Sequence, residues 1–169
     1  RLEERIKTTK PYQVDAKVYE AGDPLRNVYA VKSGMFKSYI IDADGNEHIV
    51  AFHLPGELFG LDAIHAKRYI STAKAIGTST VCAIEYDSLT SLSLSLPTLQ
   101  RQLMNLMSKE FSSAQALLAE QSADRKLAGF LLGLSTRFKQ RGYSETTFNL
   151  VMQRSDIANN LNILYTLYR

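Results

Sequence analysis

The stretch that decides the fold is LPTLQRQLMNLMSKEFSSAQALLAEQ, residues 96–121. Apolar side chains recur in it at spacings of 3, 4, 3 and 4 residues. These side chains are Met104, Met107, Phe111, Ala114 and Leu118. The spacing is typical of a two-stranded coiled coil, in which each helix buries its apolar row against the other. A second apolar row on a neighbouring face, at residues 99, 103 and 106, predicts contact with the chain's own body. We therefore expect a long helix that joins two copies of the chain.

Two residues mark where this helix is expected to begin. Ser95 carries a hydroxyl suited to an N-cap, and Pro97 fits a first helical turn, where its missing N–H needs no partner. Further back, Asp87 is expected to cap a shorter helix that leads into the long one.

The first half of the chain predicts strands. Short segments rich in β-branched and aromatic residues alternate with turn residues such as Ser33-Gly34 and Asp44-Gly45. The expected strands cover residues 17–20, 28–31, 36–40, 48–52, 71–76 and 80–86. About eight short strands with glycine turns and little helix between them indicate a jelly roll or a Greek-key barrel.

The C-terminal part predicts helices again. Residues 123–141 carry an apolar face and end in basic residues before Gly142, and residues 148–152 alternate like a short strand. Residues 154–161 follow, with Ser155 as the expected N-cap and the small Ala158 where the first helix of a helix-turn-helix packs. The recognition helix that should come next is missing, because residues 163–169 are mostly apolar and offer one terminal arginine. We expect that this heptapeptide does not follow Asn162 directly in the intact protein.

Charge is unevenly placed along the chain. Residues 1–122 hold 13 Lys and Arg against 14 Asp and Glu, whereas residues 123–169 hold 7 against 3. A basic C-terminal quarter behind a neutral body indicates a nucleic-acid-binding end and a sensing end. No signal peptide and no apolar run of 18 residues is present, so we expect a cytoplasmic protein without membrane contact.

The order of the expected elements resembles the CRP/FNR superfamily of bacterial transcription regulators. In its residues the chain is also similar to the FNR branch of that superfamily, the fumarate and nitrate reductase regulators. The matching motifs are YAVKSG at 29–34, KSY at 37–39, FHLPGEL at 52–58, LDAI at 61–64, VCAI at 81–84 and RFKQRGYS at 137–144. The resemblance covers about residues 10–162. It implies an α+β fold with a β-roll sensor domain (1–94), a dimerisation helix (95–122) and an incomplete winged helix-turn-helix (123–169).

The FNR branch implies an oxygen sensor whose [4Fe–4S] cluster is held by four cysteines. Cys82, the chain's single cysteine, falls where the β-roll cysteine of that set lies. The other three would belong to a segment before Arg1, so a cluster is expected in the intact protein and not in residues 1–169 alone. From the residues themselves, one cysteine on a strand is more often a small buried hydrophobe.

The same branch implies the partners, namely a second copy of the chain, palindromic promoter DNA and RNA polymerase. For DNA contact only Arg154 and Ser155 can be named, because the Glu, Ser and Arg that read bases in FNR-like proteins have no match after Asn162. A further departure is that the chain is about three residues shorter than the branch between Phe111 and Arg125.

Three other functions remain open from the residues. A cyclic-nucleotide sensor needs Gly-Glu for the ribose, present as Gly56-Glu57, and an Arg directly before Ser or Thr for the phosphate. Ser71 is preceded instead by Ile70, with Arg68 two positions further back. A haem-based gas sensor would use a histidine, either His48, His53 or His65. An enzyme needs clustered histidines and carboxylates, and these histidines show no such spacing.

Overall fold

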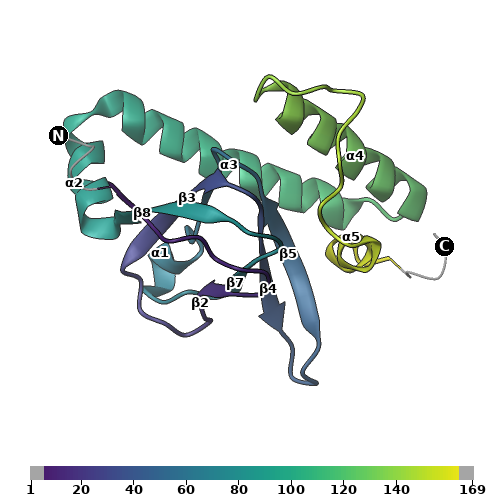
Figure 1. Ribbon diagram of the computed structural model, residues 1–169, viewed down its shortest axis with the longest axis horizontal. Coiled ribbons are helices and arrows are strands. Elements are labelled where there is room, and N and C mark those ends of the chain that lie inside the picture. The colour runs from purple at the N-terminus through teal and green to yellow at the C-terminus, as the bar shows by residue number, and fades with distance from the viewer. Residues whose placement is uncertain (1–5, 164–169) are drawn as a thin grey trace. The chain divides into compact units, whose positions relative to one another are not determined.

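The computed structural model describes residues 6–163 and divides into two compact units between Leu92 and Ser93. Helix α2 (Tyr86–Ser95) runs through this division. The first unit holds the strands and one short helix, and the second holds the three helices that follow α2 (Figure 1). No helix within residues 6–163 has both the length and the apolar character that crossing a membrane requires.

Eight strands of the first unit form two four-stranded sheets. The strands are β1 (Ile6–Thr8), β2 (Lys17–Tyr19), β3 (Asn27–Ser33), β4 (Phe36–Ile41), β5 (Glu47–His53), β6 (Leu58–Phe59), β7 (Thr72–Ala75) and β8 (Thr80–Glu85). Their order is β1-β8-β3-β6 in one sheet and β2-β7-β4-β5 in the other, and every pairing is antiparallel. One short helix, α1 (Ala63–Ala66), lies between β6 and β7 in sequence. The expected double-sheet β fold is therefore present, and we call this unit the β-roll.

The core of the β-roll lies between the two sheets and is built largely from aromatic rings. Tyr19 from one sheet stacks on Tyr69 with ring centroids 3.8 Å apart, and Tyr29 from the other sheet stacks on Phe59 at 5.4 Å. Phe36 also stacks on Phe59 at 5.4 Å. Large rings bury more apolar area than any other side chains, and stacked pairs add to that stabilisation. The interior of the β-roll is accordingly packed with side chains.

The second unit contains three helices, α3 (Pro97–Ala119), α4 (Ala123–Lys139) and α5 (Arg154–Leu161). Helix α3 confirms the expected long helix, with Pro97 in its first turn. Helices α4 and α5 contact each other. As expected for the first helix of a helix-turn-helix, α5 buries Ile157, Ala158 and Leu161.

Three capping predictions are wrong. Leu96, and not Ser95, is the N-cap of α3, and Gln153, and not Ser155, is the N-cap of α5. Asp87 lies inside the first turn of α2, since that helix already begins at Tyr86. In each case the backbone becomes helical one or two residues away from the side chain that could have capped it. A hydroxyl or carboxylate near a helix start therefore predicts the start only to within a turn.

The short strand expected at residues 148–152 is also absent from the described part of the chain, where these residues form no ladder. Their alternation has another cause. Phe148 stacks on Phe138 with ring centroids 4.8 Å apart, and Met152 is buried, whereas Leu150 between them is exposed. An extended segment thus buries alternate side chains without a partner strand.

The missing recognition helix concerns residues that lie outside the described part. Helix α5 ends at Leu161, Asn162 takes a left-handed conformation with φ 51°, and the description stops at Ile163. The prediction that residues 163–169 do not directly follow Asn162 in the intact protein therefore falls almost wholly on residues 164–169, outside that range.

Candidate functional site

Cys82 lies in the middle of β8, on the face of its sheet that points away from the aromatic core. Its neighbours in sequence, Val81 and Ala83, pack into the core cluster, and side chains alternate along a strand. In the register, Cys82 lies opposite Ala30 of β3 on one side and Thr8 of β1 on the other. The thiol is partly exposed. Cys82 is thus no core residue, which removes the commoner structural role for a lone cysteine on a strand.

Strand β1, the first element of the described residues, lies beside this thiol. Thr8 Oγ1 lies 3.9 Å from Cys82 Sγ, and Ile6 pairs with Ile84, two residues along β8. Two residues of strand span about 7 Å, and neighbouring strands are about 4.8 Å apart. Ile6 therefore lies within about 10 Å of Cys82.

A [4Fe–4S] cluster takes four thiolate ligands, and Cys82 fits the role of one of them. Among residues 6–163 no group of three or more His, Cys, Asp or Glu side chains is placed to hold a metal ion. The remaining ligands of such a cluster would have to come from outside these residues.

The histidines named for a haem sensor are spread over the β-roll. His53 Nε2 lies 2.7 Å from Ser38 Oγ, and its ring stacks on Phe59 at 4.9 Å. His48 Nε2 bonds Asp42 Oδ2 at 2.6 Å in the hairpin between β4 and β5. His65 is exposed on the short helix α1. His53 and His48 are thus engaged with protein groups in two different parts of the fold.

The residues compared with a cyclic-nucleotide site also have internal partners. Ser71 donates from its backbone N and from its hydroxyl to Asp62 Oδ2, at 3.0 and 2.8 Å. Arg68 Nη1 donates to the carbonyl oxygen of Gly22 at 2.7 Å, and Glu57 Oε2 accepts from the backbone N of Leu54 at 2.9 Å. The guanidinium and the serine are therefore not arranged as one phosphate clamp.

The apolar row of α3 is exposed along the whole helix. The exposed fractions are 64% for Met104, 47% for Met107, 66% for Phe111 and 80% for Leu118, and Ala114 is exposed as well. No residue of α3 is buried in the single chain. Such a contiguous row of large apolar side chains is what a partner helix covers.

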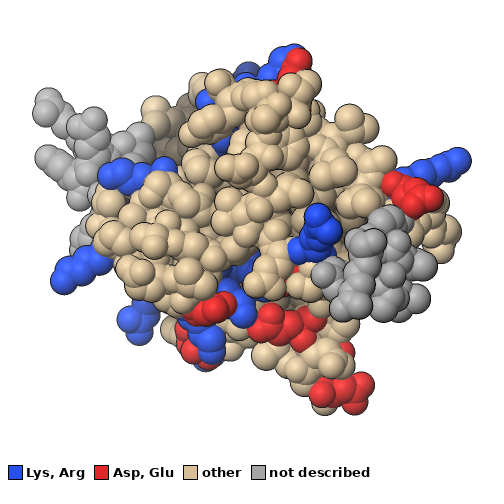
Figure 2. Space-filling view, turned by 45° about the vertical axis from the view of Figure 1, so that its right-hand side comes forward, with Lys and Arg blue, Asp and Glu red and all other residues tan. Residues whose placement is uncertain are grey.

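The residues named for DNA contact lie at the start of α5. Arg154 is its first residue and Ser155 its second, and both are exposed. Ser155 Oγ donates to Gln153 Oε1 at 3.4 Å. On the face drawn in Figure 2, grey atoms aside, Lys and Arg side chains lie apart from one another and do not gather into one basic surface.

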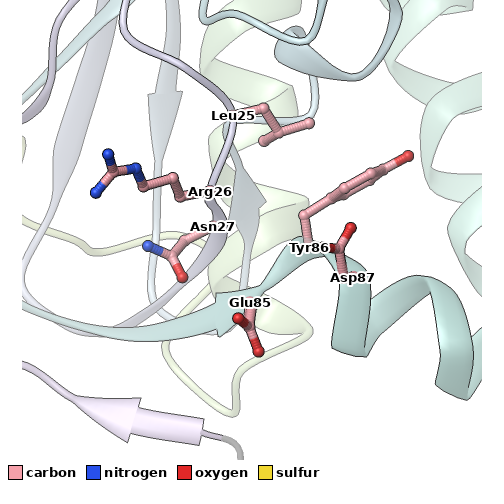
Figure 3. A pocket seen from close by; sticks show the side chains of 6 residues that line it. All are labelled: Leu25, Arg26, Asn27, Glu85, Tyr86 and Asp87. Carbon is pink, nitrogen blue, oxygen red and sulfur yellow. The ribbon is translucent and has the colours of Figure 1, made fainter.

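One pocket of about 320 Å³ lies where β8 passes into α2. Figure 3 shows the Arg26 side chain pointing away from Tyr86, with Asp87 beside Tyr86 and Glu85 at the end of β8. Tyr86 is fixed at its rim, because its backbone N donates to the carbonyl of Arg26 at 2.9 Å and Lys67 Nζ lies 4.7 Å from its ring centre. None of the residues predicted from the sequence for a site lines this pocket.

Comparisons with known proteins agree with this architecture. Residues 9–95 match the family model described as the cyclic nucleotide-binding domain. Over 165 residues the chain is 46% identical to the fumarate and nitrate reduction regulatory protein of Vibrio cholerae, which covers 96% of this chain and 66% of that protein. It is 43% identical over 165 residues to the regulatory protein HlyX of Actinobacillus pleuropneumoniae, covering 96% and 69%. The solved structure of FixK2 from Bradyrhizobium japonicum superposes with a TM-score of 0.81 at 27% identity, covering 95% of this chain and 79% of that one.

A β-roll of this type, which matches the cyclic nucleotide-binding domain over residues 9–95, belongs to that class of domains. Within that class the chain belongs to the FNR-type transcription regulators of the CRP/FNR family, as its motifs predicted. It spans 66% of the length of the Vibrio cholerae relative, slightly less than two thirds.

Proposed function

We propose that the intact protein is a DNA-binding transcription regulator that senses oxygen through a [4Fe–4S] cluster, with Cys82 as one of four ligands. The observation that carries this proposal is the position of Cys82. Its thiol points away from the core, is partly exposed, and lies beside β1, the first strand of the described residues. A thiol in that place is open to a ligand of the β-roll's outer face, which a thiol packed in the core would not be.

The cluster, when bound, supplies the reactivity toward oxygen. The residues of this chain position the ligand Cys82 and supply its thiolate. One sheet holds Cys82 at a fixed position, because β8 is paired on both sides within it, with β1 and with β3. Cys82 binds iron as a thiolate, so it must give up its proton on binding.

We further propose that α3 forms the homodimer through Met104, Met107, Phe111, Ala114 and Leu118. Fully burying a large apolar side chain contributes about 1.5–3 kcal/mol, so the four large side chains of each chain outweigh the entropy cost of association. The second unit would then present two copies of α5 to a palindromic site, with Arg154 and Ser155 near the phosphate backbone.

The test uses the full-length protein, purified without air, with Cys82→Ser. We expect the broad visible absorption of the cluster and the anaerobic binding to promoter DNA to be lost together. Thr80→Ser, two residues away on the same strand, is the matched control and should retain both. A Cys82→Ser protein with the parent's spectrum and affinity for DNA would show that Cys82 is no ligand.

A further inference from the structure

A carboxylate of the chain itself occupies the hydrogen-bond donors of Ser71. Asp62 directly precedes α1, and Ser71 directly precedes β7, so the pair closes the loop between these two elements. A single oxygen of Asp62 accepts from both the backbone N and the hydroxyl of Ser71, at 3.0 and 2.8 Å. Ser71 is only 4% exposed, whereas Asp62 is exposed. The donors therefore point from the interior toward a negative charge at the surface.

A second hydrogen-bond donor, the hydroxyl of Tyr19, interacts with Asp62 and Ser71. The hydroxyl of Tyr19 is the side-chain oxygen that is buried without a hydrogen-bond partner in the described part of the chain, and Tyr19 is 5% exposed. Burial first, and then the charge of Asp62, raise its pKa, while the nearby hydroxyls of Ser71 and Ser38 act in the opposite direction. The phenol thus lies near Asp62, Ser38 and Ser71. A buried donor of this kind is uncommon and indicates a place for an acceptor.

We propose that the backbone N and hydroxyl of Ser71, with the hydroxyl of Tyr19 beside them, form an oxyanion site that the chain fills with the carboxylate of Asp62. This goes beyond the regulatory function and does not depend on Cys82. It names the chemical class that the site accepts, a small oxyanion, and it explains why an anionic nucleotide is excluded. A phosphate at Ser71 would meet both the charge of Asp62 and the lack of the adjacent guanidinium, since Arg68 is bound to Gly22.

The position of Ser71 at the end of the loop, directly before β7, makes this site possible. Ser71 lies where β7 begins, so its backbone N is not used by the sheet ladder and remains available for an anion. The residue before it, Ile70, is exposed and cannot neutralise a second negative charge. The loop therefore carries its own anion and needs no external one to stay closed.

The experiment is chemical rescue of the whole chain with Asp62→Ala. Thermal unfolding is followed in sodium formate and in sodium chloride of equal ionic strength. We expect the midpoint to fall by about 2–8 °C in chloride, and formate at tens of millimolar to restore at least half of that loss. The parent should have the same midpoint in both salts. If formate has no effect beyond chloride on Asp62→Ala, the site does not accept an oxyanion and the proposal is wrong.

Two controls separate the site from a general salt effect. Asp62→Ala combined with Ser71→Ala should be rescued less than Asp62→Ala alone, because the hydroxyl donor is gone and only the backbone N of residue 71 remains. Asp23→Ala is the matched single variant, because Asp23 Oδ2 also accepts from a backbone N, that of Glu20, at 2.9 Å in an exposed turn. Rescue of Asp23→Ala by formate, or rescue of the double variant equal to that of Asp62→Ala, would contradict the proposal.

Should Asp62→Ala fail to fold in both salts, a double-mutant cycle decides. Asp62→Asn keeps the size of the side chain, and its coupling to Ser71→Ala is measured from unfolding equilibrium constants. We expect the coupling to change the constant by about tenfold, since a charge-assisted pair of hydrogen bonds is broken. Coupling of less than about threefold would show that Asp62 is not held by Ser71 as an anion.

Discussion

Lys37 of β4 and Lys74 of β7 lie directly opposite each other in their sheet, and both reach the carboxylate of Glu47 on β5. The distances are 4.0 Å from Lys37 Nζ to Oε2 and 3.2 Å from Lys74 Nζ to Oε1. Both lysine side chains are largely buried, at 10% and 16% exposure. Like charges opposite each other in a sheet are destabilising, so the stability of this face depends on Glu47.

Glu47→Gln should therefore lower the free energy of unfolding by about 1–3 kcal/mol, because two partly buried ammonium groups lose their shared carboxylate. Glu20→Gln is the matched control, since Glu20 pairs with Lys17 at 3.2 Å but both side chains are about half exposed. Such a surface pair contributes less than about 1 kcal/mol. Urea denaturation of the two variants gives the comparison, and equal losses would contradict the importance of Glu47.

Gly34 should tolerate no side chain. Its φ is +74°, and a Cβ there would lie 2.2 Å from the hydroxyl oxygen of Ser79. Ser79 is fully buried and its hydroxyl accepts from the backbone N of Met35 at 3.0 Å, so it cannot move away cheaply. Gly34→Ala should cost more than about 3 kcal/mol, adding a steric clash and a lost hydrogen bond to the strain of positive φ.

Gly45→Ala is the control for that substitution. Gly45 also has a positive φ, +86°, but a Cβ there would meet open space. Its cost should be limited to the backbone conformation, about 1–2 kcal/mol. Thermal unfolding of both variants separates the two contributions. If Gly45→Ala is as destabilising as Gly34→Ala, the contact with Ser79 is unimportant.

Most strands could be predicted, because their residue types and the turn residues between them are typical of β-structure. Segments such as 28–31 and 48–52 combine β-branched and aromatic side chains between turn residues, and they lie within β3 and β5. Three elements were not predicted. Strand β6 has two residues, α1 has four, and β1 has three, too few for a periodic signal. Such elements are formed by their neighbours and not by their own sequence.

The candidate site was only partly predictable. The family motif around Cys82 could be recognised, but which face of β8 carries the thiol depends on the register with β1 and β3. The carboxylate of Asp62 at Ser71 could not be found from sequence, because the two residues come together through the loop that holds α1. The sequence correctly indicated that Ser71 lacks an adjacent arginine. Nothing in the residue pattern indicated that the carboxylate of Asp62 would occupy the donors of Ser71.

Phe111→Asp should dissociate the proposed dimer. The substitution would place two carboxylates against each other at the centre of the α3 seam, where each replaces a ring that is 66% exposed in the single chain. Losing two buried rings and adding like charges should weaken association by at least about 3 kcal/mol, more than a hundredfold. Leu132→Asp on α4 is the control, since Leu132 is 68% exposed and lies outside the seam. Sedimentation velocity measures both, and an unchanged dimer with Phe111→Asp would show that the seam is elsewhere.

The hairpin between β4 and β5 should respond to acid through Asp42. Its Oδ1 accepts from the backbone N of Asp44 and of Asn46, both at 2.9 Å, and its Oδ2 bonds His48 Nε2 at 2.6 Å. The bond with His48 is the largest cause that holds the pKa of Asp42 well below its ordinary value of 3.8, followed by the bonds from Asn46. A carboxyl whose pKa is lowered on folding stabilises the fold above the ordinary value, and this stabilisation is lost as the pH falls through the lower, native one.

We therefore expect the carboxyl carbon of Asp42 to titrate below pH 3.8 when its NMR shift is followed from pH 7 downward. His48→Gln should move that midpoint upward, because the hydrogen bond with His48 is the largest cause that lowers the pKa of Asp42. Substituting His65 instead, an exposed histidine on α1, should leave the midpoint of Asp42 unchanged. A midpoint at the ordinary value in the parent, or one that ignores His48→Gln, would show that the hairpin is closed by its backbone alone.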